Sequence, residues 1–190
     1  MRHPVKSFIW YLAENFDFKA PIYDFGSKQS PNQIGESDLR VYFKGKKYIG
    51  VDCEKGAGVD EVHNMEKLSM TSCTLNSILC LDTMEHVQNP IQAMKEISRV
   101  IHPSGIFVFT SHMYAPWHYE PDYWRFTPQC LRDVLLRDFT HKQIIYRGDR
   151  NFPELVGAIA SKEPLPKKLD IKELNEYMLW SYAYPIHEFK

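Results

Sequence analysis

Three aspartates in this sequence each stand at the end of a short apolar run. Asp24 lies near the end of the first run, just before a turn at Gly26. Asp52 ends the apolar run at residues 48–52, and Asp82 follows the apolar run at residues 76–81. Open α/β sheets bind their ligands outside the carboxyl ends of the strands. A carboxylate there can accept hydrogen bonds from both hydroxyls of a ribose or from an ammonium group. For Asp52, a role as a turn cap is the alternative.

The third acid opens a turn that also contains Glu85 and His86. Two carboxylates and an imidazole could hold a divalent metal, but adjacent residues give an oxygen-rich site that is incomplete without waters. Glu85 and His86 could equally cap and orient the helix that follows, or they could contact a substrate. We therefore place no metal among the expected ligands, although the residue types allow one.

A second unusual segment, residues 111–126, carries two prolines and five tyrosine or tryptophan residues. A stiff, aromatic loop of this kind suits a flat or sugar-like compound. A structural corner that fixes the loop to the sheet is the alternative interpretation. Four of its residues are expected to bind a substrate: Trp117, His118, Tyr123 and Arg125.

A general base is needed only where the reacting group must lose a proton, and histidine titrates near neutral pH. His118 is the first candidate because it lies in the aromatic loop. His86, in the turn after the third apolar run, is the second candidate, and His112 ranks third.

Patterns of apolar residues predict strands that alternate with helices. Strands are predicted over 21–26, 48–52, 59–63, 76–81, 106–110, 143–147 and 155–160. Helices are predicted over 4–16, 38–43, 89–101, 127–139 and 171–182. Asn89 and Pro90 suit the cap and first position of one helix. The buried face of the helix from Thr127 is expected to hold Leu131, Val134, Leu135 and Phe139.

This order of elements predicts an α/β fold: Rossmann-like, doubly wound, with a mainly parallel seven-stranded sheet and helices on both faces. Residues 1–162 are expected to form one domain, in which residues 1–18 supply a covering helix. Residues 163–190 are expected to form an amphipathic extension that packs on the domain or on a second subunit.

The composition is that of an ordinary globular protein, with 44% hydrophobic and 25% charged residues among 190. A net charge of −1 gives no basic field for nucleic acid or anionic lipid. The four cysteines show no C-x-x-C spacing, which favours free thiols in a reducing compartment. The apolar patch at residues 8–13 is too short for a membrane span and makes a poor signal peptide. A cytoplasmic protein, monomer or homodimer, is expected.

Taken in order, these features resemble the class I S-adenosylmethionine-dependent methyltransferases over about residues 20–162. The glycine turn, the acid after the second strand, the polar turn after the fourth and the Pro-Ser-Gly sequence at 103–105 all occur in sequence. The chain keeps only Gly26 of the family's glycine-rich turn, and Asn64 stands where an acid is common. The segment Asp122–Pro128 also resembles one that recurs in a branch of the superfamily, and this resemblance implies that Arg125 pairs with a carboxylate and that Trp124 packs inward.

The resemblance implies S-adenosylmethionine as the cofactor, held by residues that follow the strands. Its methionine part would lie near the first and fourth strands, its ribose at Asp52 and its adenine at Asn64 and Met65. Met65 and Leu68 could cover the adenine face or belong to the core. The full implied set is Asp24, Gly26, Ser27, Asp52, Cys53, Asn64, Met65, Leu81 and Asp82.

The resemblance also implies in-line methyl transfer to a small-molecule acceptor, with S-adenosylhomocysteine as product. A relative that binds the cofactor without catalysis, or that only serves as a scaffold, is the alternative. A dinucleotide oxidoreductase is disfavoured because its pyrophosphate needs a G-x-G-x-x-G turn, which this chain lacks.

Overall fold

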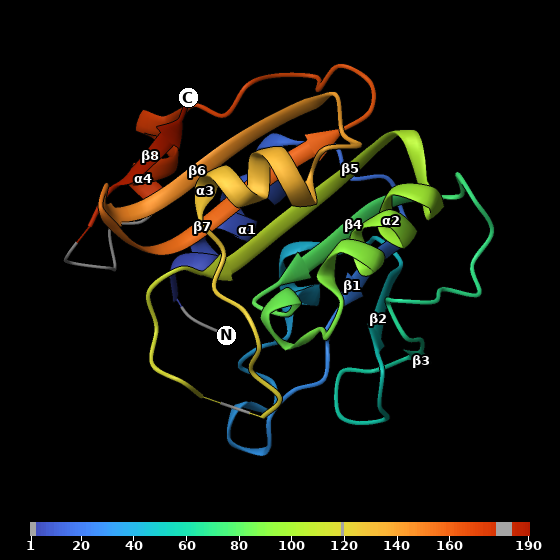
Figure 1. Ribbon diagram of the computed structural model, residues 1–190. Coiled ribbons are helices and arrows are strands. Elements are labelled where there is room, and N and C mark those ends of the chain that lie inside the picture. Colours follow the sequence, from blue (N-terminus) through green and yellow to red (C-terminus); the bar gives the residue numbers. More distant parts are fainter. Residues whose placement is uncertain (1–2, 119, 178–183) are drawn as a thin grey trace.

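A single eight-stranded sheet forms the centre of the molecule. The computed structural model describes residues 3–118, 120–177 and 184–190. Neighbouring strands follow the order β3-β2-β1-β4-β5-β7-β6-β8 (Figure 1). The strands are β1 (Ile22–Phe25), β2 (Tyr48–Asp52), β3 (Glu61–Val62), β4 (Leu75–Leu81), β5 (Ile101–His112), β6 (His141–Asp149), β7 (Phe152–Ser161) and β8 (Ile186–Phe189).

The α/β class is confirmed, but the sheet differs from the predicted one. Strands β1 to β5 pair in parallel. Strand β7 pairs antiparallel with both β5 and β6, and β8 pairs antiparallel with β6. The prediction of seven strands was wrong because β8, which follows Pro185, was not recognised.

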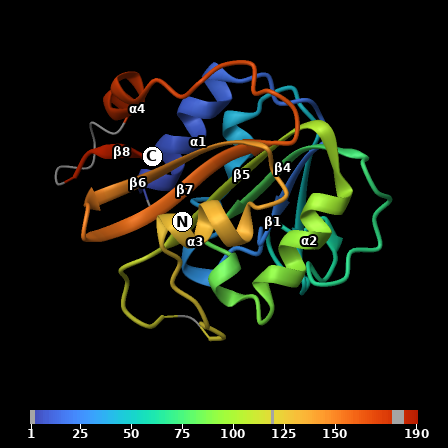
Figure 2. The same cartoon turned by 45° about the horizontal axis from the view of Figure 1, so that its top comes forward.

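Helices cover both faces of the sheet, as Figures 1 and 2 show. One face is covered by α1 and α4, and the other by α2 and α3 with η4. The connections before β4 contain no α-helix, only the short 3-10 turns η1 and η2, so strands and helices alternate less than predicted. The helical elements are α1 (His3–Asn15), η1 (Pro31–Gln33), η2 (Leu39–Tyr42), η3 (Met84–His86), α2 (Pro90–Val100), α3 (Pro128–Cys130), η4 (Leu131–Leu135) and α4 (Ile171–Tyr177).

Helix α2 begins as its sequence predicts. The Asn89 side chain accepts a hydrogen bond from the Gln92 N–H at 3.1 Å, and Pro90 occupies the first turn. Buried residues on one side of the helix, such as Ala93 and Ile97, pack against Ile78 of β4 and its neighbours. The helix therefore fixes the position of β4, and with it the turn at Asp82.

The helix that starts at Thr127 departs from the predicted pattern. Thr127 caps it by accepting from the Cys130 N–H, but η4 is a π turn closed by a hydrogen bond from the Leu136 N–H to the Leu131 carbonyl. The wider turn brings Leu136 into the core and leaves Val134 41% exposed. The prediction that Val134 is buried was wrong for this reason.

The segment after β7 adds a helix and a strand. Helix α4 is described over Ile171–Tyr177, and the rest of the predicted helix, residues 178–182, lies outside the described residues. Tyr177 contacts the rings of Trp10 and Tyr11 on α1. The Asn175 amide bonds both backbone groups of Ile186, which ties α4 to β8.

All four cysteines are free. None of the helices in the described ranges is long and apolar enough to cross a membrane.

Candidate active site

A cavity of about 750 Å³ opens at the carboxyl ends of β1, β2 and β4. This volume lies within the range of small-molecule and cofactor sites, ~300–1,000 Å³. Every residue of the implied cofactor set lines it: Asp24, Gly26, Ser27, Asp52, Cys53, Asn64, Met65, Leu81 and Asp82. His86, His112, His118 and Tyr123 line it as well.

The turn after β1 is joined closely to the turn after β4. Gly26 has a φ of +86°, which favours glycine, and a Cβ added there would lie 2.1 Å from the Thr83 Oγ1. The Thr83 hydroxyl itself contacts the carbonyls of Phe25 and Leu81 at 3.2 and 2.9 Å. Only glycine at position 26 allows the two turns to meet in this way.

Replacing Gly26 by alanine is expected to lower the free energy of unfolding by about 2–5 kcal/mol. Left-handed backbone costs an L-residue about 1–2 kcal/mol, and overpacking against Thr83 adds about 1–3 kcal/mol. Gly45→Ala is the matched control, because Gly45 also has a positive φ but has no atom within 4 Å of an added Cβ. Denaturant unfolding of both variants separates the two costs, and equal losses would contradict the steric contribution.

The loop after Gly26 packs closely against two glycines, one in β2 and one in the loop that follows β2. A Cβ at Gly50 would lie 1.9 Å from the Gly58 carbonyl oxygen, and one at Gly58 would lie 2.5 Å from the Ser27 carbonyl oxygen. The Gln29 N–H donates to the Ala57 carbonyl at 2.9 Å. The loops after β1 and β2 thus pack backbone against backbone. The roles of Gly50 and Gly58 in this contact were not predicted from the sequence.

Asp52 is half-buried at the end of β2 and organises both of these loops. One carboxylate oxygen accepts the Lys28 N–H at 3.1 Å. The other accepts the Glu54 N–H at 3.3 Å and lies 3.5 Å from the Cys53 sulfur. The carboxylate therefore caps turns and also lines the cavity.

The next connection places Asn64 and Met65 at the cavity. The side-chain Oδ1 of Asn64 accepts the Glu66 N–H at 2.8 Å, and Met65 is nearly buried. Leu68, which could have covered a ligand, packs in the core instead.

Asp24 and Asp82 differ in their surroundings. Burial raises the pKa of the Asp24 carboxyl to about 7, while the Tyr48 hydroxyl and the Arg40 guanidinium oppose that rise. Asp82 has a φ of +47°, and its carboxylate accepts from the Thr110 hydroxyl at 3.0 Å. Both carboxylates reach the same end of the cavity as the Gly26 turn.

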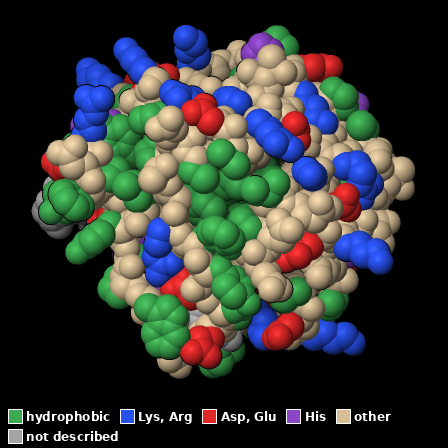
Figure 3. Space-filling view, in the orientation of Figure 1, with side chains coloured by type: hydrophobic (Ala, Val, Ile, Leu, Met, Phe, Trp, Pro, Cys, Tyr) green, Lys and Arg blue, Asp and Glu red, His purple; other side chains and the backbone are tan. Residues whose placement is uncertain are grey.

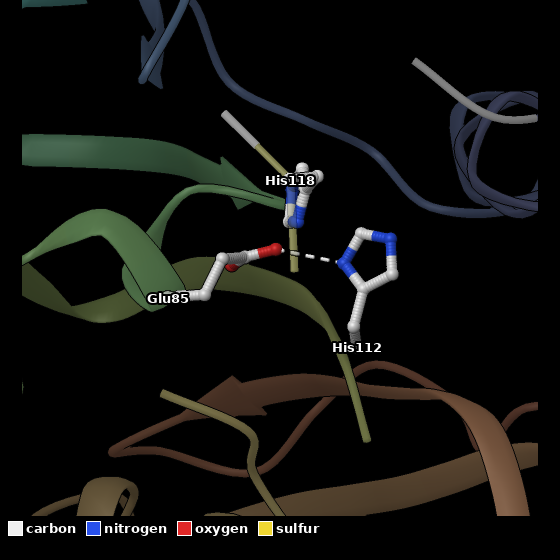
Figure 4. Close-up of side chains that lie close together, drawn as sticks. All are labelled: Glu85, His112 and His118. Atoms are coloured by element: carbon white, nitrogen blue, oxygen red, sulfur yellow. Dashed lines mark hydrogen bonds and ion pairs between the residues drawn. The ribbon is translucent and has the colours of Figure 1, made fainter. Parts of the chain in front are cut away.

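Glu85 points into the protein, where it meets the end of β5. Its fully buried carboxylate contacts Ser111 Oγ at 2.9 Å and His112 Nδ1 at 2.8 Å (Figure 4). Its backbone carbonyl accepts the N–H groups of Tyr123 and Trp124. Adjacent parallel strands bring these residues together, so a signal existed in the positions of Glu85 after β4 and His112 at the end of β5.

His118 and His86 stand at the mouth of the cavity, with ring centroids 5.1 Å apart. His118 Nδ1 lies 3.0 Å from the Asp122 carboxylate, and His86 Nδ1 contacts the Pro121 carbonyl. Two nitrogens of Arg125 bond the same Asp122 carboxylate at 2.5 and 2.8 Å. This ion pair holds the pKa of Asp122 well below its usual range.

The other predicted substrate residues are placed differently. Arg125 pairs with a carboxylate, as the segment's resemblance implied, but it also bonds the Pro116 carbonyl and lies outside the cavity lining. Trp117 is 70% exposed outside that lining. Trp124, expected to pack inward, is 42% exposed and donates to the Val87 carbonyl. Hydrophobic side chains gather over this loop in the space-filling view (Figure 3).

Comparisons with known proteins give one family and many similar structures. Residues 38–109 match the family described as Methyltransferase domain. A methyltransferase from Thermotoga maritima, described as a possible histamine N-methyltransferase, is 14% identical, with a TM-score of 0.63 over 84% of this chain and 89% of that chain. A comparison with curated protein sequences finds no match.

Two further structures show the range of proteins that share this fold. A SAM-dependent methyltransferase from Aquifex aeolicus is 14% identical, with a TM-score of 0.55 over 84% of this chain and 93% of that chain. The cyclase SpnF is also 14% identical, with a TM-score of 0.58 over 84% of this chain and 82% of that chain.

Proposed function

Since this chain matches the class I S-adenosylmethionine-dependent methyltransferase superfamily in fold and, over residues 38–109, in sequence, we propose that it methylates a small-molecule acceptor. The observation that carries the proposal is the convergence of Asp24, Asp52 and Asp82 on one cavity beside the Gly26 turn. This is the edge of the sheet at which α/β folds bind ligands.

The charge of the cavity suits a cationic ligand. Among the described lining residues there is a single lysine, Lys28, and there are six acidic residues: Asp24, Asp52, Glu54, Glu66, Asp82 and Glu120. S-adenosylmethionine supplies a methyl group on a positively charged sulfur and also carries an ammonium group. A pyrophosphate, by contrast, would be repelled by this lining.

Each part of the cofactor has a matching group in the proposal. Asp52 accepts hydrogen bonds from the ribose hydroxyls, and the side-chain Oδ1 of Asn64 accepts one from the adenine amino group. Met65 covers the adenine ring. Asp82 accepts from the ammonium group, and Gly26 lets the backbone approach closely.

Methyl transfer by in-line displacement depends mainly on alignment, which can contribute about 7–11 kcal/mol to lowering the barrier. The rigid turns at Gly26 and Asp82 supply that alignment on the cofactor side. On the acceptor side we place Tyr123, His86 and His118. His118 is the group that activates the acceptor for loss of a proton, and Asp122 holds its ring in position.

The proposal is tested by methyl transfer from labelled S-adenosylmethionine to pools of small alcohols, amines and carbon acids. We expect wild-type protein to label at least one acceptor and form S-adenosylhomocysteine. His118→Asn should lower kcat about 100-fold or more while leaving S-adenosylhomocysteine affinity within about 2-fold.

Turnover and S-adenosylhomocysteine affinity together distinguish an enzyme from a protein that only binds the cofactor. Tight S-adenosylhomocysteine binding with no acceptor turned over in any pool would favour the non-catalytic alternative. A His118→Asn variant as active as wild type would remove His118 from the mechanism.

A further inference from the structure

We propose that Glu85, His112 and His118 bind one divalent transition-metal ion at the acceptor end of the cavity. Their ligand atoms all lie within 4.8 Å of one another. The role of such an ion rests on the proposed function, but its binding does not.

The three side chains converge from separate segments (Figure 4). Glu85 comes from η3, His112 from the end of β5, and His118 from the loop that follows. The fully buried carboxylate of Glu85 lies behind the two imidazoles, which line the cavity. An ion held here would therefore be bound by Glu85 on its protein side and would keep coordination positions open toward the cavity.

The buried charge of Glu85 favours a cation at this place. Within the described ranges, its carboxylate contacts one hydroxyl, from Ser111, and one imidazole, from His112. The nearby Arg125 directs two of its nitrogens to Asp122 instead. A buried carboxylate is costly unless a positive charge or a metal accompanies it. A metal ion bound by this carboxylate would supply the positive charge.

The arrangement around His118 favours the metal. Metal-binding histidines commonly donate their second ring N–H to a carboxylate, which fixes the tautomer and the ring orientation. His118 Nδ1 lies 3.0 Å from Asp122, whose side chain is fully buried and clamped by Arg125. This leaves Nε2 of His118 as the lone-pair donor. The Ser111 hydroxyl fixes the Glu85 carboxylate in the same manner.

The ligand set indicates the class of ion. Two imidazoles and one carboxylate suit Mn²⁺, Fe²⁺, Co²⁺ or Zn²⁺, whereas Mg²⁺ and Ca²⁺ prefer oxygen ligands alone. Ligands about 2.1 Å from an ion lie about 3.0 Å apart at a right angle and about 3.4 Å apart in a tetrahedron. The separation of 2.8 Å between Glu85 and His112 fits the right angle. Because opposite ligands lie at most about 4.2 Å apart, binding draws the loop that carries His118 slightly inward.

An octahedral ion with three protein ligands keeps three open positions on the cavity side. Two neighbouring oxygen atoms of one compound, such as vicinal hydroxyls or a hydroxyl beside a carboxylate, fit these positions. A hydroxyl bound to the ion loses its proton more readily than a free one. His118 would then activate the acceptor through the metal, and the substrate class becomes a chelating oxygen compound.

The test is titration of chelator-treated protein with Co²⁺, followed by visible absorbance, and with Mn²⁺, followed by electron paramagnetic resonance. We expect one ion per chain with a Kd in the micromolar range or below. His118→Ala and Glu85→Gln should each weaken binding at least 100-fold, and Asp122→Asn about 10–100-fold. The control His86→Ala removes an imidazole beside the cluster and should change Kd less than about 3-fold.

Wild-type protein that binds no ion, or His118→Ala that binds as tightly as wild type, would overturn the proposal. Because His118 is in an exposed loop, that variant decides the matter even if Glu85→Gln fails to fold. Affinity for S-adenosylhomocysteine, measured on the same samples, reports separately on the proposed function. Metal binding without S-adenosylhomocysteine binding would reject the methyltransferase proposal and leave the metal site standing.

Discussion

Replacing Asp52 by alanine is expected to weaken S-adenosylhomocysteine binding by at least about 100-fold. Two charge-assisted hydrogen bonds to the ribose hydroxyls, each worth about 1.5–3 kcal/mol, are lost together. A loss of about 3 kcal/mol already corresponds to more than 100-fold in Kd. Calorimetric titration of wild-type and variant protein with S-adenosylhomocysteine measures the effect.

The control must allow for the structural contacts of Asp52, which also accepts the N–H groups of Lys28 and Glu54. Asp60→Ala serves this purpose. Asp60 accepts the Gly50 N–H at 2.8 Å and pairs with Arg40, but it does not line the cavity. We expect Asp60→Ala to lower stability and to retain most of the affinity. Unchanged affinity in Asp52→Ala would assign Asp52 to turn capping alone.

The second large effect is a loss of stability with rising pH that is due to Asp24. Its pKa is about 7 in the folded protein, against an ordinary value of 3.8. The folded state therefore holds a proton that the unfolded chain has released. The stabilisation is fully present below about pH 4 and is lost as pH rises through 7, by up to about 4 kcal/mol.

Asp24→Asn isolates this contribution because the amide resembles the protonated carboxyl in shape and charge. The free energy of unfolding of wild type, measured relative to that of Asp24→Asn, should fall between pH 5 and pH 8. Wild type and variant must be compared at each pH because other carboxylates change the stability of both proteins in the opposite direction. A difference that stays constant with pH would show that the Asp24 carboxyl is already ionised at pH 5.

The surroundings of Asp24 explain the size of this shift. Burial dominates, and the nearby charges of Asp38 and Asp52 raise the pKa further. The Tyr48 hydroxyl and the Arg40 guanidinium act in the opposite direction. If a cationic cofactor binds beside this carboxyl, it favours the ionised form. Affinity for S-adenosylmethionine, which carries the positively charged sulfur, should then rise between pH 6 and pH 8 in wild type and stay flat in Asp24→Asn.

The positions of the acids could be predicted from the sequence because each depends on a local pattern. An apolar run followed by an acid locates the end of a strand, and parallel strands share one edge. For this reason Asp24, Asp52 and Asp82 all line the cavity. The start of α2 could be predicted for the same reason, because Asn89 and Pro90 are neighbouring residues that favour the beginning of a helix.

The remaining features depend on contacts between distant segments. Strand β8 exists because the Asn175 amide and β6 offer it hydrogen bonds, and its four residues carry too weak a pattern to be recognised. The role of Gly58 follows from a loop that it meets only in the fold. The positions of Glu85 and His112 after two strands were visible in the sequence, but their contact also depends on β4 and β5 being neighbours in the sheet.

The short outer strands of the sheet also decide how the molecule meets its neighbours. An unpaired strand edge is a template on which another chain can add a strand, and long, flat edges promote aggregation. Here the two outermost strands are β3, with two residues, and β8, with four. The nine-residue β6 would otherwise form an open border. Strand β8 thus shields β6 and leaves little backbone for unwanted growth of the sheet.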